Sequence, residues 1–282
     1  MLKIFVLMFV AMSMIPAGDA AGKILTTDHS ASPLFVAWSR FALGALVALP
    51  LARHDTVRLL GNWRIWLRAC MLLGGITCIQ IALQTAPIAN VFAAFFIGPI
   101  FSYVLSVFLL KESVTPFRNI MMGLGFLGVL LVVRPGFETS SGLMFAAMAG
   151  LFYGTFLTTS RWLSTIARPS SLLFTQLFIP ALLLTPFAWA LVPDVTLAVT
   201  GLTLASSLFS MGGNFLLLFA YARADATTLA PFVYFQLFAA TLLGWVLFQD
   251  LPDMTTWLGL ALIIGAGIAS ATFGARARRS DT

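Results

Sequence analysis

The chain has 282 residues, of which only 9% are charged and 60% are hydrophobic, and its mean hydropathy is +0.99. So little charge cannot cover a protein of this length with a water-compatible surface, which excludes a water-soluble domain and indicates a surface that faces lipid. The net charge of +6 comes without a basic stripe interleaved with aromatic residues. It therefore argues against nucleic-acid binding and fits the basic cytoplasmic loops of a membrane protein.

The apolar runs are long enough to cross a bilayer, because about 20 apolar residues span a hydrocarbon core of about 30 Å. Runs such as 121–133 and 257–269 are continuously apolar or small, unlike the alternating pattern of a membrane β-barrel. The sequence predicts an all-α membrane protein with about ten transmembrane helices. In chain order they cover 3–22, 33–52, 65–85, 88–110, 117–133, 142–160, 170–192, 197–221, 226–248 and 255–273.

The first predicted helix also resembles a secretory signal peptide, with Lys3, an apolar run and a small-residue ending at Ala20. Asp19 disfavours cleavage at that position, and the residues that follow Ala20 continue the helix. We expect the helix to be retained, and cleavage is the alternative.

The basic residues indicate the orientation of the chain. With the N-terminus inside, the exterior segments hold only Lys23 and Arg134, and Arg40 lies inside a span. The positive-inside rule then predicts a bacterial-type inner-membrane protein with both termini in the cytoplasm. The interior segments hold Lys3, Arg53, Arg58, Arg64, Arg68, Lys111, Arg118, Arg161, Arg168, Arg223, Arg276, Arg278 and Arg279.

The two halves of the chain show the same order of features when the sequence is shifted by 138 residues. In each half a short alanine-rich turn precedes a long helix that ends in an acid followed shortly by proline. The first such loop carries Lys111 and Arg118 and the second carries no base, as expected of equivalent loops on opposite sides of a membrane. We predict two inverted five-helix repeats at 1–135 and 136–275, and a basic cytoplasmic tail at 276–282. The shift aligns Ala82, Ala86, Phe96 and Glu112 with Ala220, Ala224, Tyr234 and Asp250.

The acid–proline turns at 111–116 and 249–252, with the stretches 19–25 and 35–41, resemble the EamA domains of the drug/metabolite transporter superfamily. The resemblance covers nearly the whole chain. It implies two inverted five-helix repeats around a central cavity that opens alternately to either side. Within the superfamily, the amino-acid exporters are the closest match, on topology and aromatic content.

Charged residues in the predicted spans are candidates for an outer gate or a charged substrate-recognition cluster. Arg40 lies about 10 Å into its predicted helix, and Asp19 and Lys23 lie one turn apart on one helix face. We expect Asp19 to pair with Arg40 or Lys23, with Trp38 nearby. The alternative is a set of snorkelling side chains and an ion pair that only stabilises the fold.

Uncharged polar and aromatic residues predicted near the membrane midplane are candidates for substrate binding. Amides and phenols can orient an ammonium or carboxylate, and aromatic faces can hold an apolar or cationic part. The alternative is that they only join helices by hydrogen bonds. The candidates are Ser13, Gln80, Tyr103, Tyr153, Asn214, Tyr234 and Gln236.

Prolines and glycines add expectations about motion and packing. Prolines inside predicted spans are either hinges for alternating access or ordinary packing kinks, and they are Pro16, Pro99, Pro180 and Pro231. Small residues let helix backbones approach, so glycines in the fifth and tenth predicted helices suggest a scaffold or a dimer surface. These are Gly123, Gly125, Gly128, Gly259, Gly265 and Gly267.

No phosphate-binding loop, metal motif or catalytic constellation is found in the sequence, so no enzyme, metal or cofactor is expected. The sequence predicts a secondary transporter that exports small metabolites, amino acids first, by alternating access. A carrier or effluxer of drugs, vitamins or nucleoside-like substrates is the alternative, and a membrane enzyme or assembly factor comes third. The expected partners are a small-molecule substrate and lipid. Coupling to a proton through Asp19 and the oligomeric state are left open.

Overall fold

The computed structural model describes residues 2–52, 54–111, 116–133, 141–163, 166, 168–221 and 233–280. Within these residues all regular structure is helical. Five helical stretches are long and apolar enough to cross a membrane, at Val6–Asp28, Trp63–Thr85, Ile88–Leu109, Ser141–Ser160 and Ser170–Leu191. Shorter apolar helices lie at Pro33–Ala48, Asn119–Val133, Phe235–Phe248 and Met254–Ala269. The prediction of an all-α fold is confirmed for these residues.

The helices begin where the sequence provides caps. Ser32 accepts a hydrogen bond from the amide of Leu34 at the start of α2, and Asn62 does the same for Arg64 at the start of α4. The first half contains α1 (Leu2–Asp28), α2 (Pro33–Ala48), α3 (His54–Leu59), α4 (Trp63–Thr85), α5 (Ile88–Phe95), α6 (Ile97–Leu110) and α7 (Pro116–Val133). The second half contains α8 (Ser141–Leu163), α9 (Pro169–Ala188), α10 (Leu197–Tyr221), α12 (Phe235–Phe248) and α13 (Met254–Ser280).

Several helix limits differ from the predicted ones. Helix α1 continues to Asp28 because 23–28 contains no helix breaker, and α2 ends at Ala48 because Pro50 lies in a 3₁₀ turn. The predicted helix 88–110 is two helices separated at Phe96, since Pro99 cannot donate to the carbonyl of Phe95. Helix α13 continues through the predicted tail 276–282 as far as Ser280, since no proline stops it.

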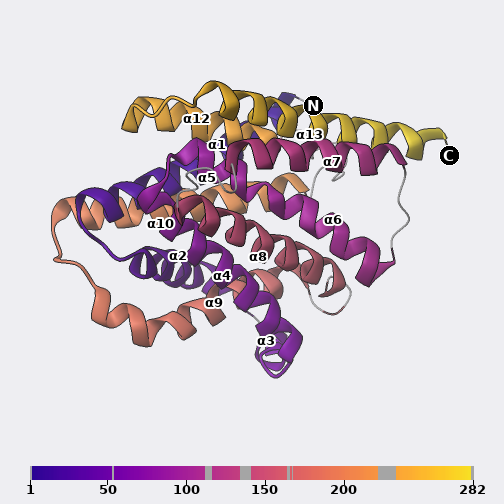
Figure 1. The fold of residues 1–282 in the computed structure, drawn as a ribbon. Helices are drawn as coiled ribbons and strands as arrows, with labels where there is room; N and C mark the ends of the chain where they lie inside the picture. Colours follow the sequence, from indigo (N-terminus) through magenta and orange to yellow (C-terminus); the bar gives the residue numbers. More distant parts are fainter. Residues whose placement is uncertain are drawn as a thin grey trace.

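Helices from the two halves pack against one another. Helix α1 lies along α10 and also contacts α12, while α4 and α6 both pack on α8. Helices α7 and α13 lie side by side along the upper edge in Figure 1, and α2 and α9 pack together at the lower left. A Cβ added to Gly128 or to Gly259 would lie 2.7 Å from the other glycine's carbonyl oxygen, so the α7 and α13 backbones touch where they cross. The predicted close packing of these helices is confirmed at this pair.

The largest apolar core of the described residues surrounds the fully buried Leu83, Ile88 and Phe92 and includes Phe96 at the helix break. Phe96 and Tyr234 immediately precede α6 and α12, and their rings contact each other with centroids 5.3 Å apart. The Tyr234 ring lies so close to Gly267 that it occupies the space a Cβ would need. The contact of Phe96 with Tyr234 joins the two halves of the chain.

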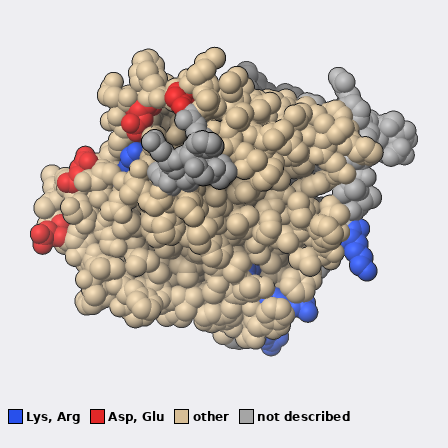
Figure 2. Space-filling model, viewed as in Figure 1, with Lys and Arg blue, Asp and Glu red and all other residues tan. Residues whose placement is uncertain are grey.

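Exposed charges are separated between the two ends of the bundle. Figure 2 shows the acidic side chains along the upper-left margin and most basic ones along the lower-right margin. The exposed acids Asp28, Asp194 and Asp253 lie at helix ends or in links, the exposed Arg58 lies in the last turn of α3, and the exposed Arg168 directly precedes α9. Such a separation is typical of a membrane protein with one basic side.

Candidate functional site

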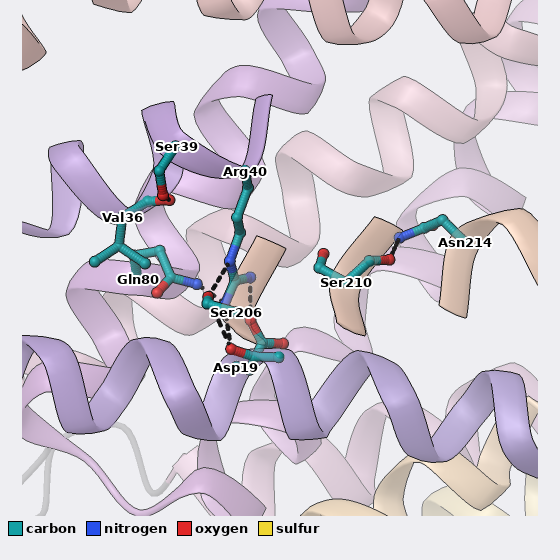
Figure 3. A network of polar contacts seen from close by, with 9 residues as sticks. Asp19, Val36, Ser39, Arg40, Gln80, Ser206, Ser210 and Asn214 are labelled. Atoms are coloured by element: carbon teal, nitrogen blue, oxygen red, sulfur yellow. Dashed lines mark hydrogen bonds and ion pairs between the residues drawn. The ribbon is translucent and has the colours of Figure 1, made fainter. Parts of the chain in front are cut away.

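Arg40 is the centre of a buried polar network, which we name the Arg40 cluster and which comprises Asp19, Arg40, Gln80 and Ser206 (Figure 3). The guanidinium of Arg40 donates from Nη1 to Asp19 Oδ1 at 2.5 Å, from Nε to Ser206 Oγ at 2.9 Å and from Nη2 to the Gly18 carbonyl at 2.7 Å. Gln80 Nε2 donates to the same Asp19 oxygen at 3.1 Å. The cluster therefore joins α1, α2, α4 and α10.

The Arg40 cluster is almost inaccessible to water. Asp19 and Arg40 are only 3% and 6% exposed, and Gln80 and Ser206 are fully buried. The predicted pairing of Asp19 with Arg40 is confirmed by the geometry. Gly22 leaves room for the cluster, because an added Cβ would lie 2.6 Å from Gln80 Oε1 and 2.9 Å from Arg40 Nη2. Among the described residues Gln80 Oε1 has no hydrogen-bond partner, so the network is polar but not fully satisfied.

Lys23 pairs elsewhere, although it lies one helical turn from Asp19. Its Nζ donates to the carbonyl of Ala86 at 2.9 Å, lies 3.5 Å from Asp250 Oδ2 and lies 4.7 Å from the centre of the Phe248 ring. A lysine suits the carbonyl at the C-terminal end of α4, where the helix dipole is negative. Lys23 thus links α1 to the end of α4 and to the link between α12 and α13.

A second buried arginine, Arg68, is held quite differently. Its Nε donates to Ser160 Oγ at 2.7 Å, its Nη1 to the Leu172 carbonyl at 3.1 Å and its Nη2 to Gln176 Oε1 at 2.6 Å. The guanidinium also lies over the Phe156 ring, 4.6 Å from its centre. These five residues, which we name the Arg68 cluster, join α4, α8 and α9.

A chain of aromatic contacts runs from the Arg68 cluster to the helix break. The rings of Phe156 and Tyr153 are stacked with centroids 5.8 Å apart, and Tyr153 contacts Phe95 at 5.0 Å. Phe95 is the last residue of α5, next to the break at Phe96. Of the predicted substrate residues, Tyr153 and Tyr234 therefore lie on aromatic contacts at or near the break.

The other predicted substrate residues are dispersed. The hydroxyl of Ser13 and the amide of Asn214 bond to carbonyls of their own helices, and Figure 3 shows Asn214 apart from the Arg40 cluster, bonded to Ser210. The Tyr103 hydroxyl donates to Asn119 of α7 at 2.7 Å, and Gln236 is buried near the start of α12. The structure brings only Gln80 into the Arg40 cluster.

Trp38 and the predicted hinge prolines lie outside both arginine clusters. Trp38 donates from its indole nitrogen to Thr185 of α9 at 3.0 Å, away from Asp19. Pro16 and Pro180 lie inside α1 and α9, whereas Pro99 lies in the first turn of α6 directly after the break. Pro231 lies outside the described residues.

The sequence predicts Gln80 as a site residue but misses Ser206, Ser160 and Gln176, because a lone serine or glutamine away from the predicted midplane gives little signal in a single sequence. The sequence assigns Arg68 to the interior basic residues, near the start of the predicted helix 65–85. The cap at Asn62 could have shown that α4 begins earlier and that Arg68 lies deeper, about 8 Å into the helix. No group of His, Cys, Asp and Glu in the described part of the chain could hold a metal ion.

Three curated proteins are similar to this chain along most of its length. A riboflavin transporter of Brucella anthropi is 26% identical over 93% of this chain and 95% of its own. An S-adenosylmethionine uptake transporter of Rickettsia felis is 28% identical over 89% of this chain and 86% of its own. A pseudopaline exporter of Pseudomonas aeruginosa is 27% identical over 83% and 84% of the two chains. None of these three is named for amino-acid export.

A solved structure and a family model also match this chain along nearly its whole length. One solved crystal structure superposes with a TM-score of 0.67 at 20% identity, over 99% of this chain and 98% of that chain. The model of the EamA-like transporter family matches twice, at residues 2–134 and 140–272. These matches confirm the resemblance at the level of the family and point to a membrane transporter rather than an enzyme. The chain belongs to the EamA-like transporter family.

Proposed function

We propose that this chain is a secondary transporter that moves a small metabolite by alternating access between two inverted five-helix repeats. The observation that carries the proposal is the double family match, at 2–134 and 140–272. In a protein built from two related halves, each half can adopt the conformation of the other. The site between them then opens first to one side of the membrane and then to the other.

The geometry of the two halves supports the repeat. The shift of 138 residues relates Lys111 to Gln249, and both adopt the left-handed conformation at the ends of α6 and α12. It also relates Phe96 to Tyr234, which cap the same two helices. The same shift relates α1 to α8, α4 to α10 and α6 to α12. The helix contacts follow this relation, because α1 packs on α10 as α8 packs on α4, and α1 packs on α12 as α8 packs on α6.

The charge distribution supports the predicted orientation. The exposed acids lie in segments predicted to be outside, and Arg58, Arg64 and Arg168 lie in segments predicted to be inside. We therefore place the Arg68 cluster on the cytoplasmic side and the Arg40 cluster on the outer side of an inner membrane, with both termini in the cytoplasm.

Amino acids and their derivatives are the first substrate class. The relative named for S-adenosylmethionine uptake supports an amino-acid derivative, and the aromatic rings beside the helix break suit a planar portion of a substrate. The riboflavin-transporter relative makes riboflavin-like compounds the second candidate.

The test is flux through proteoliposomes, measured in both directions with labelled S-adenosylmethionine, riboflavin and a mixture of amino acids. We expect saturable flux of one class, reduced at least tenfold by Tyr153→Ala. Phe187→Ala serves as the control, because it also removes an aromatic ring but from an exposed position on α9. A pH gradient of either sign shows whether a proton is coupled. Flux no higher than in protein-free liposomes, from folded protein, would refute the proposal for these classes.

A further inference from the structure

The Arg68 cluster contains a buried positive charge without a carboxylate beside it in the part of the chain that the structure describes. Arg68 is 6% exposed, and its hydrogen-bond acceptors are a hydroxyl, a carbonyl and an amide. These neutral acceptors orient the guanidinium but do not cancel its charge. An ionisable group placed in this way inside a membrane protein is costly, and its position calls for a function.

The internal repeat shows where a carboxylate would be expected. The shift of 138 residues relates Arg68 to Ser206 and Ser160 to Gly22, so the two arginine clusters occupy corresponding junctions. The same shift relates Asp19 to Leu157. One junction contains its own acid, and the other has leucine at the corresponding position.

Arg68 retains the capacity to bind an anion. A guanidinium has five N–H groups, and the three bonds within the cluster use one on each nitrogen. One N–H on each terminal nitrogen is then left to donate to a further acceptor. Ser160 and Gln176 are only half-buried, so this edge of the cluster can be approached. A carboxylate fits the paired donors of an arginine and supplies the missing charge.

The aromatic contacts extend this site toward the helix break. The Phe156 ring covers one face of the guanidinium, and Tyr153 and Phe95 continue the row of rings. Tyr153 and Phe95 are half-buried. Ring faces at this spacing accept a flat apolar group by offset or edge contacts.

We propose that the Arg68 cluster binds the carboxylate of the transported metabolite, whose planar apolar part lies against Phe156 and Tyr153. Ser160 and Gln176 act as positioning residues that hold the guanidinium. The inference rests on the proposed transport function and names its substrate class as small carboxylates with a planar apolar body.

The test measures binding rather than flux, in purified protein at constant ionic strength. The probes are 3-phenylpropionate and its neutral amide, 3-phenylpropionamide, each titrated while the melting temperature is recorded. We expect the carboxylate to bind at least about tenfold more tightly than the amide, because a charged hydrogen bond is worth that factor or more. Equal binding of the two probes would overturn the proposal.

Two variants of opposite design keep the result interpretable. Arg68→Gln removes the charge, and Ser160→Asp supplies an internal carboxylate to Arg68 Nε; both should abolish the preference for the carboxylate probe. Ser160→Asn is the matched neutral control for Ser160→Asp and should lose much less of the preference. A preference that persists in a folded Arg68→Gln or in Ser160→Asp would overturn the proposal.

Two further outcomes separate this site from its alternatives. Stabilisation by phosphatidylglycerol that depends on Arg68 and that 3-phenylpropionate does not compete would assign the cluster to lipid and overturn the proposal. If flux is intact but the carboxylate preference is absent, the proposed anion site is wrong and the proposed transport function stands. A carboxylate preference without any flux supports the anion site and contradicts the proposed function.

Discussion

Arg40 and Arg68 both join three or more helices from a buried position, but their charges are compensated differently. Arg40 donates directly to the carboxylate of Asp19, whereas the three hydrogen-bond acceptors of Arg68 are all neutral. A paired charge in a low-dielectric interior fixes its neighbours and has little affinity left for a ligand. Burial and hydrogen bonding alone therefore do not identify an arginine that binds a ligand. The presence or absence of a carboxylate partner within the fold distinguishes the two arginines.

The largest effect should come from breaking the pair in the Arg40 cluster. Asp19→Asn leaves the guanidinium buried without a carboxylate, which should lower the free energy of unfolding by about 3–5 kcal/mol. The measurement is unfolding in mixed micelles of increasing SDS content. The double variant Asp19→Leu/Arg40→Met removes both charges and should be much closer to wild type. A loss below about 1 kcal/mol in Asp19→Asn would contradict a tight pair.

A smaller effect should follow from filling the space at Gly22. Gly22→Ala places a methyl group against Gln80 Oε1 and Arg40 Nη2, both of which are held in the buried cluster. We expect a loss of about 1–3 kcal/mol in the same unfolding assay. Gly201→Ala is the control, because a Cβ there meets nothing within 4 Å. If both alanines behave alike, the Arg40 cluster is more adaptable than its geometry indicates.

The smallest effect should come from Arg68→Gln. This change removes three hydrogen bonds from a charged donor, each worth about 1.5–3 kcal/mol, but it also removes the cost of an uncompensated buried charge, which is several kcal/mol. The two terms oppose each other, so the loss should be about 1 kcal/mol or less. A loss as large as that of Asp19→Asn, in parallel melts of the two variants, would show that Arg68 also has a fixed counter-charge.

The sequence predicts the helices well because their limits depend on local features. The predicted range 197–221 is identical to α10, and 65–85 differs from α4 only by the turn that Asn62 caps. The break at Phe96 was missed, since Pro99 lies three residues later and proline is also tolerated inside a membrane helix.

The candidate sites were less predictable because they depend on contacts between distant residues. Asp19 and Arg40 lie in neighbouring helices, so their pairing could be foreseen as one of two choices. The contact of Lys23 with Asp250 joins opposite ends of the chain, and a single sequence provides no measure of such a distance. The role of Arg68 depends on which groups surround it, and that information belongs to the fold.

The crossing of α7 and α13 has a consequence for biosynthesis. Gly128 is translated in α7, whereas Gly259, whose backbone it touches, belongs to α13 and is translated 131 residues later. Until then lipid tails cover the Gly128 face of α7, and they do so without the penalty that water would impose on an apolar surface. The bilayer thus keeps α7 competent for assembly until α13 inserts beside it.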